Sequence, residues 1–263
     1  MTARFAGRVA VVSGSTHLPS IGRSIATRLA REGASVVING PDPDVLAETE
    51  QAMAADGLRV ASSCGSLGEP GAAAALVDTA HRAFGGLDLV VNTVGGARYS
   101  GPPLQTTRSD LVQNLELNTW PPLELLEEAM RAGLGNGAAV MFISSASVNK
   151  TTASMASYSA GKAALNALIR TLAKDLAGKG IRLNGVAPAL TRTTATKGLW
   201  EADGGVAVGR NAVLGRMTEA DDVAAAAVFL LSDDARAITG VVLDVDGGNH
   251  LQSGGWSPNA PSS

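Results

Sequence analysis

Short apolar runs alternate with longer amphipathic segments along most of the chain. The runs are rich in valine and lack regular polar positions, which is typical of parallel strands buried on both faces. We expect strands at Val9–Val12, Ser35–Ile38, Leu58–Ala61, Leu87–Asn92, Ala139–Ser144, Arg182–Val186 and Val241–Val245. The longer segments predict helices at Ile21–Glu32, Asp44–Asp56, Gly71–Phe84, Arg108–Ala132, Ser157–Gly178 and Glu219–Leu231. This alternation predicts an α/β fold, a doubly wound parallel sheet of about seven strands with helices on both faces.

The alternation contains no linker, so we expect residues 1–263 to form a single domain. The longest stretch without a clear pattern is 191–216, and loops of this length usually serve as lids or substrate loops. The last segment, 253–263, is rich in serine, glycine and proline. Such a composition predicts a loose tail or an oligomer contact.

Composition narrows the class of protein. Of the 263 residues, 45% are hydrophobic and 17% charged, which is enough apolar sequence for a sizeable core. The net charge of -3, without a Lys/Arg cluster, argues against a nucleic-acid or membrane partner. The only cysteine, Cys64, is compatible with a reducing cytoplasm, and no apolar run near the N-terminus is long enough for a signal helix, so we expect a cytoplasmic protein. The scattered histidines and cysteine predict no metal site.

Tyr158 and Lys162 carry the strongest chemical signal. Four residues apart on a predicted helix, their side chains leave the same face one turn apart. A phenol has a pKa of about 10 and exchanges protons poorly at neutral pH, but a fixed ammonium nearby lowers that pKa. We therefore expect the pair to give and take a proton in a carbonyl–alcohol interconversion. Ser145 lies thirteen residues upstream of Tyr158.

The first predicted turn has the position of a dinucleotide site. The segment from Gly14 to Gly22 follows the first strand and opens the first helix, where free backbone N–H groups bind phosphate. Its glycines are eight residues apart, and Ser20 takes the place of the usual middle glycine, followed by Ile21. A plain flexible loop is the rival interpretation, but the placement favours pyrophosphate binding.

Together, these motifs resemble the short-chain dehydrogenase/reductase family from Gly7 to about Asn249. Six matches occur in the family's order: Asn92-Thr93-Val94-Gly95, Asn118, Ile143-Ser144-Ser145, Tyr158 with Lys162, the segment Asn184–Thr193 with Pro188, and the segment Thr239–Gly248. The resemblance implies a Rossmann-type fold and a ketone/secondary-alcohol oxidoreductase that uses NAD or NADP.

The resemblance also implies a role for each matched residue. Ser145 would hydrogen-bond the substrate oxygen, Tyr158 would transfer the proton, and Lys162 would hold the ribose of the nicotinamide and lower the tyrosine pKa. Asn118 would anchor a water molecule, and Thr193 would bind the carboxamide. The implied cofactor contacts are Gly14, Ser20, Ile21, Gly22, Asn39, Gly40, Asn92, Val94, Gly95, Tyr158, Lys162, Pro188 and Thr193.

Some positions depart from the family pattern. The extended loop that starts at Gly14 is closer to that of enoyl reductases, but their lysine would fall on Leu165, so the helix follows the ordinary Tyr-x-x-x-Lys subfamily. Gly65 stands where the family usually has an aspartate that holds adenine, and Ala189 replaces the glycine after Pro188.

The sequence leaves the choice between NAD and NADP open. An acidic residue after the second strand favours NAD, and a basic one favours NADP, but here Gly40 and Pro41 take these positions. The pair Asn39-Gly40 resembles NADP-type members, which gives a slight preference for NADP. Asp42 favours NAD if it reaches a ribose, and Arg23 is a candidate phosphate partner.

Several alternatives remain open. Ser144 is the neighbouring candidate for the catalytic serine, and Asn118 is equally compatible with a structural role inside its helix. Trp200, Trp120 and Met217 are candidate pocket residues, and Trp120, which precedes two prolines in a helix pattern, is more typical of packing or an interface. A non-catalytic dinucleotide-sensing protein and an enoyl reductase are the alternative functions. The resemblance further implies a homotetramer or homodimer paired through Arg108–Ala132 and Ser157–Gly178. The identity of the small-molecule substrate does not follow from the sequence.

Overall fold

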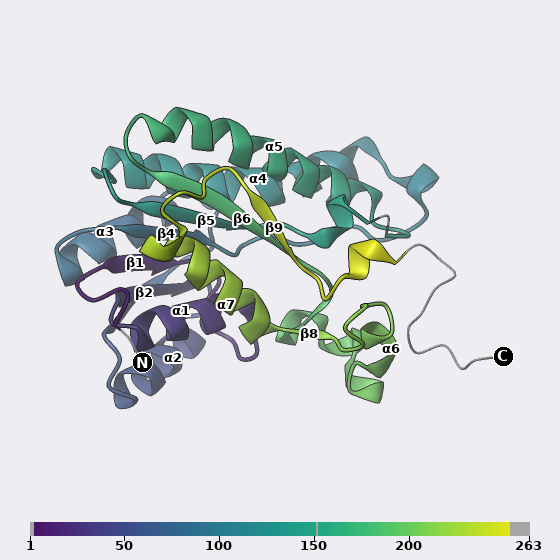
Figure 1. Ribbon diagram of the computed structural model, residues 1–263, viewed down its shortest axis with the longest axis horizontal. Helices are drawn as coiled ribbons and strands as arrows, with labels where there is room; N and C mark the ends of the chain where they lie inside the picture. The colour runs from purple at the N-terminus through teal and green to yellow at the C-terminus, as the bar shows by residue number, and fades with distance from the viewer. Residues whose placement is uncertain (1–2, 151, 253–263) are drawn as a thin grey trace.

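Seven parallel strands form the central sheet of the computed structural model, which describes residues 3–150 and 152–252 (Figure 1). The strands lie in the order β3-β2-β1-β4-β5-β6-β9. Their bounds are β1 (Val9–Val12), β2 (Ser35–Gly40), β3 (Val60–Cys64), β4 (Leu89–Asn92), β5 (Ala139–Ile143), β6 (Arg182–Pro188) and β9 (Val242–Val245). Every pairing between neighbours is parallel. The predicted fold class is confirmed.

Helices cover both faces of the sheet (Figure 1). One face is packed by α1 (Ile21–Arg31), α2 (Pro43–Ala55) and α7 (Ala220–Leu231), and the other by α3 (Ala72–Phe84), α4 (Arg108–Arg131) and α5 (Ala156–Ala177). In β1, Ala10 and Val12 join the first core, whereas Val9 and Val11 join the second. Strands β1 and β5 are apolar at every position because both of their faces are buried.

The predicted third strand was displaced. It was expected at Leu58–Ala61, but β3 runs from Val60 to Cys64 and pairs with β2 up to Gly40. Leu58 instead closes the end of α2, where its N–H donates to the Met53 carbonyl at 3.1 Å after Gly57 takes a left-handed φ of 75°. Leu58, an apolar residue just before the strand, therefore belongs to the end of the helix and not to the strand.

The segment 191–216 is more ordered than its lack of pattern predicts. It contains β7 (Thr191–Arg192), the 3₁₀ turns η3 (Thr194–Leu199) and η4 (Glu201–Asp203), and the short helix α6 (Val206–Gly209). Strand β7 pairs with β8 (Thr218–Glu219), next to α7. These elements are held by side-chain contacts rather than by a repeating apolar pattern. The predicted tail, 253–263, lies outside the described residues.

The carboxyl ends of the sheet strands meet at one edge, where the connections to α1, α4 and α5 leave the sheet. Strand order reverses between β1 and β4, which is the place where open α/β sheets bind ligands. Among residues 3–150 and 152–252, we find no helix with the length and apolar character needed to cross a membrane.

Candidate active site

Tyr158 and Lys162 lie on the first two turns of α5 and face the carboxyl end of β5, as their spacing predicts. The ammonium of Lys162 is only 3% exposed and donates a hydrogen bond of 2.8 Å to the carbonyl of Ile143, the last residue of β5. The same nitrogen lies 6.0 Å from the centre of the Tyr158 ring. The end of the strand thus fixes the lysine, and the helix fixes the tyrosine beside it.

Burial shifts the two pKa values in opposite directions. It lowers the pKa of Lys162 to about 8, because the charged ammonium loses its hydration. Burial raises the pKa of Tyr158 above its ordinary value, and a hydrogen bond with the Ser145 side chain lowers it by less. Burial and Ser145 are the causes of the Tyr158 shift in this arrangement, and the ammonium of Lys162 donates to the Ile143 carbonyl; the expected lowering of the tyrosine pKa by Lys162 stays a prediction. At neutral pH, Tyr158 holds its proton.

The structure distinguishes the two serine candidates. Ser145 follows β5 directly, and its hydroxyl lies close enough to Tyr158 to lower the pKa of the phenol. It also accepts the Ser147 N–H at 3.2 Å and so caps a 3₁₀ turn, η2 (Ala146–Val148). The hydroxyl of Ser144 is bonded to Asn166 of α5 and is 2% exposed. Only Ser145 lies beside the phenol, as the thirteen-residue spacing predicts.

Asn118 is fully buried in α4 and braces the loop that follows β4. Its side-chain oxygen accepts the Gly96 N–H at 3.1 Å, and its amide donates to the Gly96 carbonyl at 2.9 Å and to the Asn114 carbonyl at 2.8 Å. The structural interpretation of this side chain is thus supported. Its backbone carbonyl is a separate feature: the helical donor four residues on is Pro122, which has no N–H.

Asn114 is a residue that sequence reasoning missed. One turn before Asn118, it is also fully buried, and it accepts the Arg98 N–H at 3.1 Å and donates to the Ser157 hydroxyl at 3.1 Å. It therefore ties the loop after β4 to both α4 and α5. The signal was two asparagines at i and i+4 on one helix face, because polar residues on a buried face need partners.

The loop between β1 and α1 presents unused backbone donors. Ser20 caps α1 by accepting the Arg23 N–H at 3.2 Å, and its extended φ of -147° requires no glycine. The N–H groups of Ile21 and Gly22 have no partner among the described residues, as expected for a first helical turn. A side chain on Gly22 would come within 2.4 Å of the Gly14 carbonyl, so a glycine is needed for the loop to close on the helix.

Two predicted cofactor residues are structural braces. The amide of Asn39 is 1% exposed and donates at 3.0 Å to the carbonyls of Ser63 and Gly65, which joins β2 to β3. Asn92 accepts from the Ser13 hydroxyl and donates to the Val94 carbonyl, both at 3.0 Å, which joins the ends of β1 and β4. Their side chains shape the edge of the crevice; direct cofactor contacts by Asn39 and Asn92 stay predictions.

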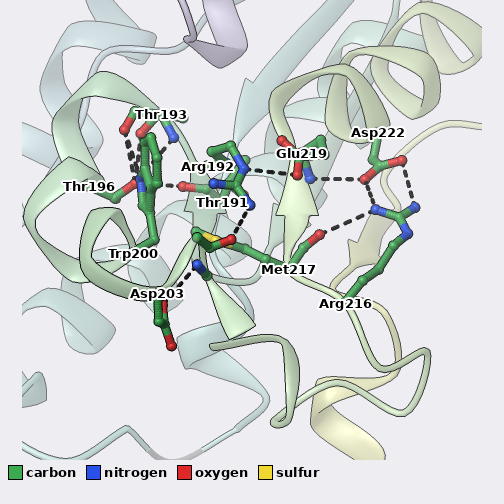
Figure 2. A network of polar contacts seen from close by, with 12 residues as sticks. Thr191, Arg192, Thr193, Thr196, Trp200, Asp203, Arg216, Met217, Glu219 and Asp222 are labelled. Atoms are coloured by element: carbon green, nitrogen blue, oxygen red, sulfur yellow. Dashed lines mark hydrogen bonds and ion pairs between the residues drawn. The ribbon is translucent and has the colours of Figure 1, made fainter. Parts of the chain in front are cut away.

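Thr193 follows β7, five residues beyond Pro188 at the end of β6. It is 8% exposed, and its backbone N–H and hydroxyl both meet the Thr196 hydroxyl, at 3.2 and 3.1 Å (Figure 2). Among residues 3–150 and 152–252, no group of three or more histidine, cysteine or acidic side chains could hold a metal ion.

Comparison with known proteins identifies the family. A family model described as enoyl-(acyl carrier protein) reductase matches residues 14–250. A probable short-chain type dehydrogenase/reductase of Bradyrhizobium diazoefficiens is 34% identical over 258 residues, 93% of this chain and 88% of the relative. The chain belongs to the short-chain dehydrogenase/reductase family. It is an NAD(P)-dependent oxidoreductase of that family.

Solved structures of short-chain dehydrogenases/reductases have the same fold as this chain. A member from Mycobacterium ulcerans is 31% identical, with a TM-score of 0.87 over 97% of this chain and 93% of its own. An angucycline C-6 ketoreductase with bound NADP is 26% identical, with a TM-score of 0.85 over 96% of this chain and 99% of its own. Both matches extend over nearly all of this chain.

In this short-chain dehydrogenase/reductase, Thr93 directly follows β4 and contacts the end of β1. Its hydroxyl donates to the Ser13 carbonyl at 2.7 Å, and its N–H donates to the Ser13 hydroxyl at 3.0 Å. Thr93 thus fastens the end of β4 to the end of β1.

Gly95 separates Lys162 from Asn118, and adding one methyl group there should reduce turnover. A Cβ at this position would lie 2.8 Å from both the Lys162 nitrogen and the Asn118 side-chain oxygen. We expect Gly95→Ala to displace the lysine and lower kcat at least tenfold, while the unfolding temperature changes little. Gly86→Ala, where a Cβ meets nothing within 4 Å, is the matched control. Full activity of the Gly95 variant would contradict this geometry.

The buried lysine should also make stability depend on pH. Its pKa falls from 10.5 to about 8 on folding, so between pH 8 and 10 the unfolded chain binds more protons than the folded one. The free energy of unfolding should therefore rise with pH over this range, by about 2 kcal/mol from this group. Denaturant titrations of wild type and Lys162→Met measure the difference. Parallel pH dependences in the two proteins would show that Lys162 is not buried as a charge.

Proposed function

We propose that this protein is a reductase that converts a small-molecule ketone into a secondary alcohol, and catalyses the reverse reaction, with Tyr158 as the acid and base. The observation that carries the proposal is the arrangement around the phenol of Tyr158. It lies next to Ser145 and beside the buried ammonium of Lys162, at the carboxyl end of β5, and burial raises its pKa. The four-residue interval between the two residues supports the ordinary Tyr-x-x-x-Lys subfamily as part of this proposal.

The chain's own side chains account for the proton transfer. Ser145 donates a hydrogen bond to the substrate oxygen, where negative charge develops during reduction. Tyr158 gives that oxygen its proton, and its raised pKa keeps the phenol in the acid form that reduction needs. In the oxidation direction the same group must act as a base, so oxidation should be favoured by higher pH. Ser145 and Tyr158 are therefore the catalytic pair at the reacting oxygen.

Lys162 and Asn118 support the proton donor. Lys162 stabilises the phenolate left after proton transfer, because its ammonium is fixed beside the ring. The carbonyl of Asn118 has no helical donor, because residue 122 is proline, and so it is available to a water molecule. We assign to this carbonyl the anchoring of the water that returns a proton to the tyrosine through Lys162.

The residues at the crevice fit a nicotinamide dinucleotide, which when bound supplies the hydride. The fit rests on the open N–H groups of Ile21 and Gly22 at the start of α1, which match a pyrophosphate, and on the close contact of Gly14 with Gly22. Ser20 keeps that helix end capped. Lys162 is the candidate partner of the ribose hydroxyl groups. The segment from Pro188 to Thr193 is assigned to the nicotinamide end, with Val94 and Gly95 across from it.

Two observations favour NADP over NAD. Strand β2 ends at Gly40 without a carboxylate, and Asp42 caps α2 by accepting the Asp44 and Val45 N–H groups at 3.0 and 3.2 Å. The Asp42 carboxylate, the feature that favoured NAD, therefore serves as the N-terminal cap of α2. Arg23 is 7% exposed, and its Nε has no partner among the described residues, which leaves a cation next to the loop. These features disfavour the ribose 2′-hydroxyl of NAD and favour the 2′-phosphate of NADP.

An enoyl reductase is the second candidate function. The family model that matches residues 14–250 bears that description, and the extended loop after Gly14 fits it. Against it stands Leu165, which occupies the position of the lysine of enoyl reductases. A panel of ketones and conjugated thioesters decides between the two. The ketone reductase predicts turnover of ketones only. A tyrosine poised as an acid also argues against a non-catalytic dinucleotide sensor.

The tyrosine assignment predicts a separation of binding from turnover. Tyr158→Phe removes the only proton that the phenol can give, so we expect turnover to fall at least a thousandfold while cofactor affinity changes less than twofold. Steady-state assays measure the first quantity, and thermal-shift titrations with NADPH and NADH measure the second.

Wild-type protein is the control in both titrations, and NADPH should shift its unfolding temperature more than NADH does. Turnover by the Tyr158 variant at the wild-type rate would refute the acid–base role. A larger shift with NADH would refute only the preference for NADP.

Self-association through α4 and α5 is a further part of the proposal. Leu111, Val112 and Trp120 are 39%, 40% and 47% exposed on α4. A groove of about 290 Å³ between the two helices is lined by Leu123, Leu126, Met130, Leu172 and Leu176 together with the charged Glu127, Arg131 and Lys179. A face of this kind, which combines apolar side chains with charges of both signs, fits a second copy of the chain. The proposed state is a homodimer or homotetramer.

Changing the groove should therefore change the oligomeric state. We expect Leu172→Asp to yield monomers in sedimentation experiments, because it places a charge among the apolar side chains of the groove. Leu104→Asp changes a fully exposed leucine outside these helices and is the control. A monomeric wild type, or an unchanged Leu172 variant, would contradict pairing through this face.

A further inference from the structure

Arg192 is the centre of a network of contacts at the start of the substrate loop (Figure 2). Its Nε donates to the Glu219 carboxylate at 3.0 Å, and its Nη2 donates to the Gly204 carbonyl at 2.5 Å. The face of its guanidinium lies 4.6 Å from the centre of the Trp200 ring. One side chain thus joins β7, the turn at 204 and the indole. We call residues 193–204 the capping segment.

The capping segment is closed on itself around Thr193. The indole N–H of Trp200 donates to the Thr193 carbonyl at 3.2 Å. The Thr196 hydroxyl accepts the Thr193 N–H at 3.2 Å and donates to the Thr191 carbonyl at 2.6 Å. Because Trp200 contacts both Arg192 and Thr193, the position of Thr193 depends on the stacking of the indole on the guanidinium. Trp200, expected as a candidate pocket residue, is thus part of this brace.

Arg192 is itself held by the base of α7. Its partner Glu219 pairs with it across β7 and β8, and the Glu219 N–H donates to Asp222 at 2.9 Å. Asp222 in turn receives both terminal nitrogens of Arg216, at 2.6 and 2.9 Å. The buried face of α7 packs in the core of the sheet, so Glu219 and Asp222 stand at the end of a helix that is held by the core. The network therefore fixes the segment to the rigid part of the fold.

We propose that Arg192 is a positioning residue that holds Thr193 against the nicotinamide end of the cofactor by clamping Trp200. Because Thr193 meets the carboxamide only under the proposed function, this role depends on it. The role needs an arginine: a planar guanidinium offers an apolar face to the indole and, at the same time, donors in two directions within its plane. A lysine ammonium can keep the ion pair with Glu219, but it cannot also stack on the indole and donate to the Gly204 carbonyl.

A purely structural role makes a different prediction. It would lower stability, or weaken every part of cofactor binding equally. A positioning role weakens only the interactions of the nicotinamide half, because under the proposed function the adenosine half would be held at the end of β2, on the other side of the crevice. The comparison therefore needs one ligand with nicotinamide and one without it.

The test measures dissociation constants of NADPH and of 2′-phospho-ADP-ribose, which lacks nicotinamide, on the full chain. Loss of a stacked cation–aromatic contact weakens the state that the contact holds in place. We expect Arg192→Lys to raise the NADPH constant about tenfold and to leave that of the fragment within twofold. Trp200→Phe keeps a ring against the guanidinium but loses the bond to the Thr193 carbonyl, so about threefold is expected.

Arg28→Lys is the matched control. Arg28 of α1 forms an ion pair through two nitrogens with Asp221 of α7, away from the capping segment. This change should leave both constants unaltered. Unfolding temperatures of all variants show that the fold is intact, and the Trp200 variant keeps the test valid if Arg192→Lys does not fold. Should NADH bind better than NADPH, the pair becomes NADH and ADP-ribose.

Each outcome decides something. Equal weakening of both ligands, or no weakening of either in the Arg192 and Trp200 variants, overturns the positioning role while the proposed function stands. A wild-type protein that binds neither NADPH nor NADH overturns both. Selective weakening of the nicotinamide-containing ligand supports the positioning role, whatever the turnover numbers are.

Discussion

The constraint on which the site depends is the burial of one ammonium group at the end of β5. Lys162 is 3% exposed, and the Ile143 carbonyl is its hydrogen-bond acceptor among the described residues. Burying a charge in protein is costly unless polar groups surround it, so the fold must bring such groups together. Asn118 comes from α4, and Gly95 leaves the space between them. The close contact of the two helices at Gly161, where a Cβ would meet the Asn114 carbonyl, permits this arrangement.

The same burial determines which proton is available. It lowers the pKa of the lysine and raises that of the tyrosine, so as pH rises Lys162 loses its proton before Tyr158 does. Under the proposed function, the chain's own electrostatics therefore favour the acid form of Tyr158 and with it the reduction of a ketone. The sequence indicated that the two residues act together, but the direction of the tyrosine shift required knowing what the lysine contacts.

Structure that depends on short-range sequence patterns could be predicted from the sequence. The continuous apolar runs predicted buried parallel strands, and i, i+4 spacing placed Tyr158 and Lys162 on one helix face. Contacts between residues that no short-range pattern links could not be predicted from it. The cap that Asp42 provides for its own helix was not visible in the sequence, and Leu58 looked like a strand residue but closes α2. The order of 191–216 comes from Arg192 meeting Trp200 and Glu219, which no short-range pattern encodes.

The protonation of Tyr158 is tested most directly by a spectroscopic titration of its phenol. The chain has two tyrosines, so in a Tyr99→Phe background the ultraviolet absorbance of tyrosinate reports on Tyr158 alone. Because burial raises its pKa above the ordinary value of about 10, less than half of Tyr158 should be ionised at pH 10 in the folded protein. Ionisation complete near neutral pH would show that the lysine governs the phenol and would contradict the account of Tyr158 as a protonated donor.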